Sequence, residues 1–378
     1  MFRDWIRFDR NELAGAFGDI GTDLPLIVGM ILAAGLDSAS VLIMFGAMQI
    51  FTGLRYGIPM PVQPLKAMAA LVIAQKLSGS VLFGGGSVVG VIMLVLTVTG
   101  LIEWLARVVP KTVVRGIQFG LGLQLATLAL KNYVQADGAA GYVLAAVGLV
   151  IIISLMGNRR FPAALFVIAL GIIYAFAFNI DLRAVSQGAG FRLPHLHSLT
   201  QQDLLTGLIV LAIPQIPLSL GNSILATRQV AEDFFPGRPL SIRTISFTYS
   251  LMNLVNPWFG GVPTCHGSGG MAGHYTFGAR TGGSVVIYGC FYLTLGLFFS
   301  GCFAQLIQIF PKPILGVLLA FEGLAMLLLV RDIAGSKADL LIAMLVGLMA
   351  VGLPNGYGIG LIAGTALVYL WRNRQQAI

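Results

Sequence analysis

GIPMPVQPLKAMAA, residues 57–70, interrupts an otherwise apolar stretch of chain with three prolines and a lysine. Proline stops a helix that precedes it but fits the first turn of a helix that follows it. We therefore expect the chain to run extended to Gln63 and a short helix to begin at Pro64. Lys66 then falls in the first turn of that helix, within a region whose flanks predict lipid.

The composition defines the class of protein. Of 378 residues, 57% are hydrophobic and only 10% are charged, and the mean hydropathy is +0.88. Soluble domains carry about 25% charged residues, so the expected fold is an all-α polytopic membrane protein, with the lipid bilayer as a partner. The net charge of +8 does not indicate nucleic acid, because the basic residues fall in loops between apolar segments.

A second stretch, GVPTCHGSGGMAG at 261–273, matches the first, with Gly57 over Gly261 and Pro59 over Pro263. LPLIVGMIL (24–32) matches IPLSLGNSIL (216–225), and VPKTVVRGIQFGLG (109–122) matches FPKPILGVLLAFEG (310–323). The three matches keep their order along the chain, which predicts an internal duplication.

The apolar segments predict 14 spans as a 7+7 inverted repeat, because an odd number of spans per repeat inverts the second copy. The first repeat is 1–180, a polar external connector covers 181–203, and the second repeat is 204–378. The expected spans are 12–34, 39–54, 59–76, 81–106, 112–131, 140–156 and 161–180, then 204–227, 243–260, 263–279, 283–307, 313–330, 338–353 and 356–372. The third and tenth are broken, which is typical of transporters.

The distribution of basic residues predicts the orientation. When both termini are placed in the cytoplasm, most of the 23 Lys and Arg residues lie in cytoplasmic segments, as the positive-inside rule requires. We expect an integral protein of the cell (inner) membrane, with no cleavable signal peptide before the first span.

The two broken spans indicate an anion site. A helix that begins inside the membrane leaves its first N–H groups without partners, and two such helix N-termini related by inverted symmetry would face one point. The candidate substrate-binding residues are Thr22, Gln63, Pro64, Lys66, Gln215, Asn222, Thr264, Cys265, His266, Gly267 and Ser268. Lys66 binds either the anion or a nearby acid. Cys265 and His266 have structural roles as alternatives, in packing for Cys265 and in hydrogen bonding for His266.

Three acids lie inside predicted spans: Asp19 and Asp23 in the first, and Glu322 in the twelfth. Such residues are usually paired or functional. They are candidates for proton coupling or for charge pairing, and the sequence leaves both open.

Other classes of function find less support. Cys265, Cys290 and Cys302 form no disulfide or metal pattern, and His195 and His197 fall in the external connector, so we expect no metal, no cofactor and no enzyme. A nucleobase permease needs carboxylates for ring N–H groups, but the eighth span carries Gln215 and Asn222 instead. An anion channel on the same fold stays open.

These motifs carry a resemblance. ELAGAFGDIGTDLPL, GIPMPVQPLKAMAA, IPQIPLSLGNSILA and LMNLVNPWFGGVPTCHGSGGMAGHYTFGART resemble the molybdate transporter family related to the SulP sulfate permeases, across both repeats. The resemblance implies the inverted-repeat fold shared with uracil permeases, without a STAS domain. It also implies a core domain at about 12–106 plus 204–307 and a gate domain at about 107–180 plus 308–372.

The resemblance further implies a secondary active transporter that takes up molybdate by alternating access, and by analogy with related permeases a homodimer. Molybdate and sulfate are tetrahedral dianions that only accept hydrogen bonds at neutral pH, whereas phosphate keeps a proton. The expected donors suit the first two ions, and tungstate, but do not tell them apart, so sulfate or another oxyanion is the alternative substrate.

Overall fold

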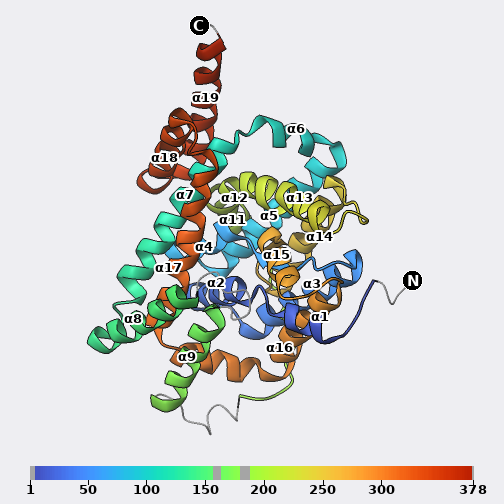
Figure 1. Ribbon diagram of the computed structural model, residues 1–378, viewed down its shortest axis with the longest axis vertical. Helices are drawn as coiled ribbons and strands as arrows, with labels where there is room; N and C mark the ends of the chain where they lie inside the picture. Colours follow the sequence, from blue (N-terminus) through green and yellow to red (C-terminus); the bar gives the residue numbers. More distant parts are fainter. Residues whose placement is uncertain (1–4, 156–162, 179–187, 377–378) are drawn as a thin grey trace.

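The computed structural model describes residues 5–155, 163–178 and 188–376, and almost all of this chain is helical (Figure 1). The first half contains α1 (Arg10–Ala16), α2 (Ile20–Ala34), α3 (Ser38–Tyr56), α4 (Lys66–Gln75), α5 (Gly79–Thr99), α6 (Leu101–Val108), α7 (Lys111–Leu128), α8 (Gly138–Leu155) and α9 (Ala163–Phe178). The second half contains α11 (Gln201–Gly207), α12 (Ile213–Leu218), α13 (Thr227–Phe234), α14 (Ile242–Val255), α15 (Ser268–Thr276), α16 (Gly283–Ile309), α17 (Lys312–Leu328), α18 (Lys337–Gly352) and α19 (Gly356–Gln376).

The helices identify an integral membrane protein. Among the described residues, seven helical stretches are long and apolar enough to cross a membrane, or eight when the bent pair α1 and α2 counts as one span. Every predicted span contains helix, but α4 has 10 residues and α15 has 9, where a full crossing needs about 20. The total of 14 spans therefore stays a prediction.

Two spans predicted as continuous are interrupted. The first bends by 41° between α1 and α2. The fourth, predicted at 81–106, ends at Thr99, because Gly100 adopts a φ of +77° that closes the helix. The separate helix α6 follows.

The eighth span is one helical stretch over 201–234, longer than the predicted 204–227. Two π-helical segments widen it, η3 (Leu208–Ala212) and η4 (Ser219–Ala226), on either side of α12. Pro214 and Pro217 lie in α12, and a proline has no N–H for the regular i→i−4 hydrogen bond. Widened turns of this kind occur frequently at functional sites.

Two short strands join the halves. β1 (Val62–Pro64) pairs antiparallel with β2 (Thr264–His266), so that Gln63 lies opposite Cys265. The predicted start of a helix at Pro64 is wrong: α4 begins at Lys66. Pairing holds the chain extended for longer, and the amide of Leu65 still donates to the Pro263 carbonyl, at 3.0 Å.

Each strand is also hydrogen-bonded by an amide side chain from the helix before it. Gln49 of α3 donates to the carbonyl of Val62 (2.7 Å) and accepts from its N–H (2.8 Å). Asn253 of α14 does the same for Thr264, at 2.6 and 2.9 Å. Both amides are fully buried. Irregular backbone inside a membrane must be satisfied by protein, and these two side chains do this for the outer edges of the sheet.

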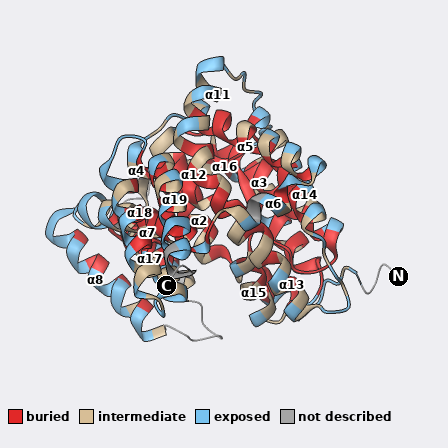
Figure 2. Cartoon of the chain, turned by 90° about the horizontal axis from the view of Figure 1, so that it is seen from above, coloured by how far each residue is buried: buried red, intermediate tan, exposed pale blue. Residues whose placement is uncertain are grey.

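The helices form two groups by their packing, and α7, α8, α17, α18 and α19 lie together on the left of Figure 1. The first group holds α7, α8 and α9 with α17, α18 and α19, and the second holds α1 to α5 with α11 to α16. Within the second group α3 packs along α16, and α5 packs along α14. In the predicted repeat, α3 of the first half corresponds to α14 of the second, and α5 corresponds to α16. The predicted two-fold relation would therefore turn the α3–α16 pair into the α14–α5 pair. Buried residues gather between the helices, whereas α8 is largely exposed (Figure 2).

Candidate functional site

A cavity of about 300 Å³ lies where the two helix groups meet beside the strands. Eight of the predicted site residues line it: Gln63, Lys66, Gln215, Asn222, Cys265, His266, Gly267 and Ser268. The remaining lining comes from residues not predicted, including Arg115, Gln118 and Ser223. The cavity thus brings together residues that are about 200 positions apart in the sequence.

The first turn of α4 is already capped. The Gln215 side-chain oxygen accepts from the amides of Ala67 (3.1 Å) and Met68 (3.3 Å). The nitrogen of the same side chain donates to Ser219, whose hydroxyl lies 2.6 Å from that of Tyr249. Gln215 therefore satisfies two of the amides that were expected to face an anion, and Lys66 is the contribution of α4 to the cavity wall.

The first turn of α15 is open on the side that faces the cavity, although Asp19 lies against Gly270. Its preceding residue, Gly267, supplies no capping side chain, and Ser268 and Gly269 line the cavity. A Cβ added at Gly269 would meet no atom within 4 Å. The helix N-terminus carries about half a positive charge. Of the two helices that follow the strands, α15 is therefore better placed than α4 to receive an anion.

Asp19 fixes the orientation of Gln63. The Gln63 amide nitrogen donates to both Asp19 carboxylate oxygens, at 2.8 and 2.7 Å. Both side chains lie close to the start of α15: a Cβ at Gly270 would fall 2.2 Å from Asp19 Oδ2, and one at Gly267 would fall 2.2 Å from the Gln63 side chain. Gln63 thus links α2 to the cavity wall, and its amide nitrogen is engaged by Asp19.

Strand β2 contributes Cys265 and His266. The Cys265 side chain lines the cavity together with Ser223 of η4, the segment on which β2 packs. The His266 Nε2 atom lies 2.7 Å from the Thr248 hydroxyl, which is also 2.5 Å from that of Tyr56. These contacts hold β2 against α3, α14 and η4.

Four predicted residues lie elsewhere. Pro64 is buried in β1, and Thr264 is bound by Asn253 and Asn256. Thr22 lies on α2 and is not part of the cavity lining, and Asp23 accepts from the Tyr288 hydroxyl at 3.3 Å. The side chain of Glu322 lies outside the described residues. Among those described, no group of three or more His, Cys, Asp and Glu could hold a metal ion.

Arg115 and Gln118 were missed, although the sequence carries a signal for them. In the third repeat match they stand where the second copy has Gly316 and Leu319. A charged residue and an amide three positions apart share one face of a helix, here in an apolar helix. The sequence alone does not show which face of α7 meets the broken spans, so it does not separate Arg115 from the other basic residues near span ends.

The described helices define a polytopic membrane protein, and solved structures share its fold. The transmembrane domain of a cyanobacterial bicarbonate transporter, BicA, aligns over 95% of this chain and 98% of that one, with a TM-score of 0.71 and 20% identity. SLC26A9 aligns over 96% of this chain and 65% of that one, with a TM-score of 0.70 and 14% identity. At these identities the likeness concerns the fold alone.

The sequence gives the family. Residues 11–125 and 207–326 match the model of the family described as "Molybdate transporter of MFS superfamily". Molybdate transporter 2 of Arabidopsis thaliana is 34% identical over 93% of this chain and 86% of its own length. Molybdate transporter 1 of the same plant is 33% identical over 95% and 88%. The chain belongs to the molybdate transporter family, which confirms the predicted resemblance and a transport protein rather than an enzyme.

Proposed function

We propose that this protein takes up molybdate across the membrane as a secondary active transporter, and that the anion binds in the cavity between the two helix groups. The observation that carries the proposal is the donor set of that cavity: the ammonium of Lys66 beside the uncapped first turn of α15, at Ser268 and Gly269. Cations and helix N-termini both favour anions.

The donor set supports an oxyanion that only accepts hydrogen bonds. Asp19, which lies against Gly270 near the open helix end, accepts from the Gln63 amide with both carboxylate oxygens. This arrangement favours molybdate, tungstate or sulfate over phosphate, which brings a proton that needs an acceptor. The names of the relatives favour molybdate among the three.

Fewer backbone donors are available to the anion than the sequence suggested. We expected two open helix ends facing each other, but Gln215 caps α4. The anion is therefore held from the α15 side, and Lys66 reaches it from the start of α4.

The arrangement of the helices supports alternating access. The group α1–α5 with α11–α16 corresponds to the proposed core domain, and α7–α9 with α17–α19 to the gate domain (Figure 1). The cavity is lined from both groups, so a movement of one against the other would change its access. Fourteen spans in two inverted repeats and a homodimer belong to the same proposal.

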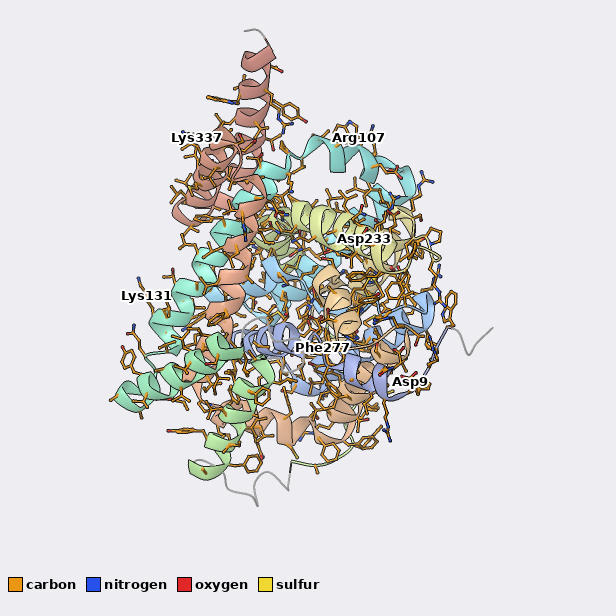
Figure 3. The ribbon with its side chains drawn as sticks, in the orientation of Figure 1. Asp9, Arg107, Lys131, Asp233, Phe277 and Lys337 are labelled. Atoms are coloured by element: carbon orange, nitrogen blue, oxygen red, sulfur yellow. The ribbon has the colours of Figure 1, made fainter. Side chains whose placement is uncertain are left out.

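The orientation is proposed on the same grounds. Arg107 and Lys337, labelled in Figure 3, lie toward the end of the molecule that carries the C-terminus, whereas Lys131 lies farther from it. This distribution supports a cytoplasmic location for that end, in the cell (inner) membrane. Asp19 and Glu322 stay candidates for proton coupling, and Asp23 for charge pairing with its neighbours.

Binding to the purified protein tests the proposal. Molybdate titrated into wild type should bind, with tungstate and sulfate as competitors and phosphate as a much weaker one. Lys66→Ala should weaken binding at least about tenfold, as loss of a charged hydrogen bond does. Lys76→Gln, at the exposed far end of α4, should leave it unchanged. Absence of molybdate binding, or equal competition by phosphate, would falsify the substrate assignment.

Uptake into proteoliposomes separates a carrier from a channel. A carrier should saturate with molybdate and remain slow relative to channel flux. Currents that rise linearly with concentration would favour the channel.

A further inference from the structure

We propose that Arg115 and Gln118 of α7 form a second wall of the anion site, so that a bound dianion is held from both helix groups at once. This inference rests on the proposed function, because it assigns further ligands to the same cavity. Both side chains line that cavity. They belong to the helix group of α7, whereas Lys66 and Ser268 belong to the other group.

The two side chains hold each other in place. Arg115 Nη1 donates to the Gln118 side-chain oxygen at 2.9 Å, and Nη2 donates to Asp332. The Arg115 side chain is 13% exposed and Gln118 is 1% exposed. A guanidinium fixed at two points loses little freedom when it binds an anion.

Each of these two side chains has one nitrogen that makes no hydrogen bond within the described structure. Arg115 Nε and Gln118 Nε2 are buried and have no hydrogen-bond partner among the residues that the structure describes. Buried donors without a partner are rare, and each calls for an explanation. Two of them, three residues apart on the lining of one polar cavity, are explained by an acceptor that enters the cavity.

The matched positions of the second repeat carry no equivalent polar side chains. The positions matched to Arg115 and Gln118 are Gly316 and Leu319. The residues of α17 and η6 (Leu329–Ile333) that line the cavity are Ala325, Met326 and Leu329. Among the side chains that the structure describes, the group of α7–α9 and α17–α19 therefore contributes polar side chains to the cavity from α7.

In this arrangement, binding of the oxyanion depends on how close the two helix groups lie to each other. Lys66 and the open end of α15 belong to one group, and Arg115 belongs to the other, where Asp332 balances its charge. An oxyanion in contact with both groups gains its full set of hydrogen bonds only where they lie close together. The doubly charged ion gains most, because charge-assisted hydrogen bonds are the stronger ones.

A matched pair of variants tests this assignment. Arg115→Gln and Lys111→Gln each remove one positive charge and one ion pair with Asp332. Lys111 lies on the same helix, but its side chain is 61% exposed and it does not line the cavity. Binding is measured with molybdate, and with perrhenate as a tetrahedral anion of single charge.

We expect Arg115→Gln to weaken molybdate binding about tenfold or more, with a smaller loss for perrhenate, and Lys111→Gln to stay within about twofold of wild type. Gln118→Leu, which installs the residue of the second repeat, should weaken both anions by a similar factor, and it decides the matter if Arg115→Gln does not fold. If wild type binds molybdate but Arg115→Gln or Gln118→Leu binds like Lys111→Gln, the second wall is refuted. If wild type does not bind molybdate, the proposed function itself fails.

Discussion

Replacing Asn253 with leucine, a side chain of nearly the same shape, should destabilise the antiparallel pair formed by β1 and β2. The substitution removes the donor to the Thr264 carbonyl (2.6 Å) and the acceptor for the Thr264 N–H (2.9 Å). Thr264 is fully buried, so water cannot replace either bond. Each buried group left without a partner costs about 1–3 kcal/mol, which gives about 2–6 kcal/mol for the two.

The assay is thermal unfolding of the purified protein in detergent, followed by intrinsic fluorescence. We expect the apparent Tm of Asn253→Leu to fall by at least about 5 °C, since each kcal/mol shifts the Tm of a medium-sized domain by about 2–4 °C. Asn253→Asp, which keeps an acceptor for the Thr264 N–H, should fall less than Asn253→Leu if it stays protonated. Asn132→Leu, on an exposed surface, is the control. An Asn253→Leu protein that melts within about 1 °C of this control would refute the role assigned to the amide.

Three further predictions concern the surroundings of the site. Gly267→Ala should reduce folded yield and molybdate binding, because its Cβ would fall 2.2 Å from Gln63, whereas Gly269→Ala meets no atom within 4 Å and should fold normally; equal yields would contradict the packing argument. Glu12→Ala should lower the apparent Tm, because this buried carboxylate accepts from three backbone amides at the start of α16, at about 1.5–3 kcal/mol for each hydrogen bond to a charged group. Asp19→Asn should change the pH dependence of molybdate uptake if this acid carries a coupled proton; an unchanged profile removes Asp19 as the carrier.

The sequence predicted the positions of the helices because their signals are local. Apolar runs, prolines and glycines place most of the predicted spans close to observed helices, and the repeated motifs point to the two segments that the structure brings together at the cavity. The failures are at positions where tertiary contacts decide. Pro64 signals a helix start, but pairing with Thr264 extends the strand past it.

The site shows the same division. Lys66 and Ser268 could be found from the broken spans alone, and the structure places both on one cavity. Gln215, a predicted ligand that lines the cavity, also caps α4. The sequence could not show this cap, because only the folded chain brings the eighth span against that helix. Arg115 and Lys111 both lie in the first turns of α7, and nothing in the local sequence distinguishes one from the other.

The pairing of β1 with β2 has a consequence for how the chain is made. The partner strand of Val62–Pro64 is encoded about 200 residues later. At about 5–20 residues per second, the first strand waits roughly 10–40 s for it after leaving the ribosome. Gln49 is already present and can satisfy one edge of β1 during that interval. The other edge of β1 has no partner strand in that interval, so the proposed binding site cannot be completed until the second half of the chain has been inserted beside the first.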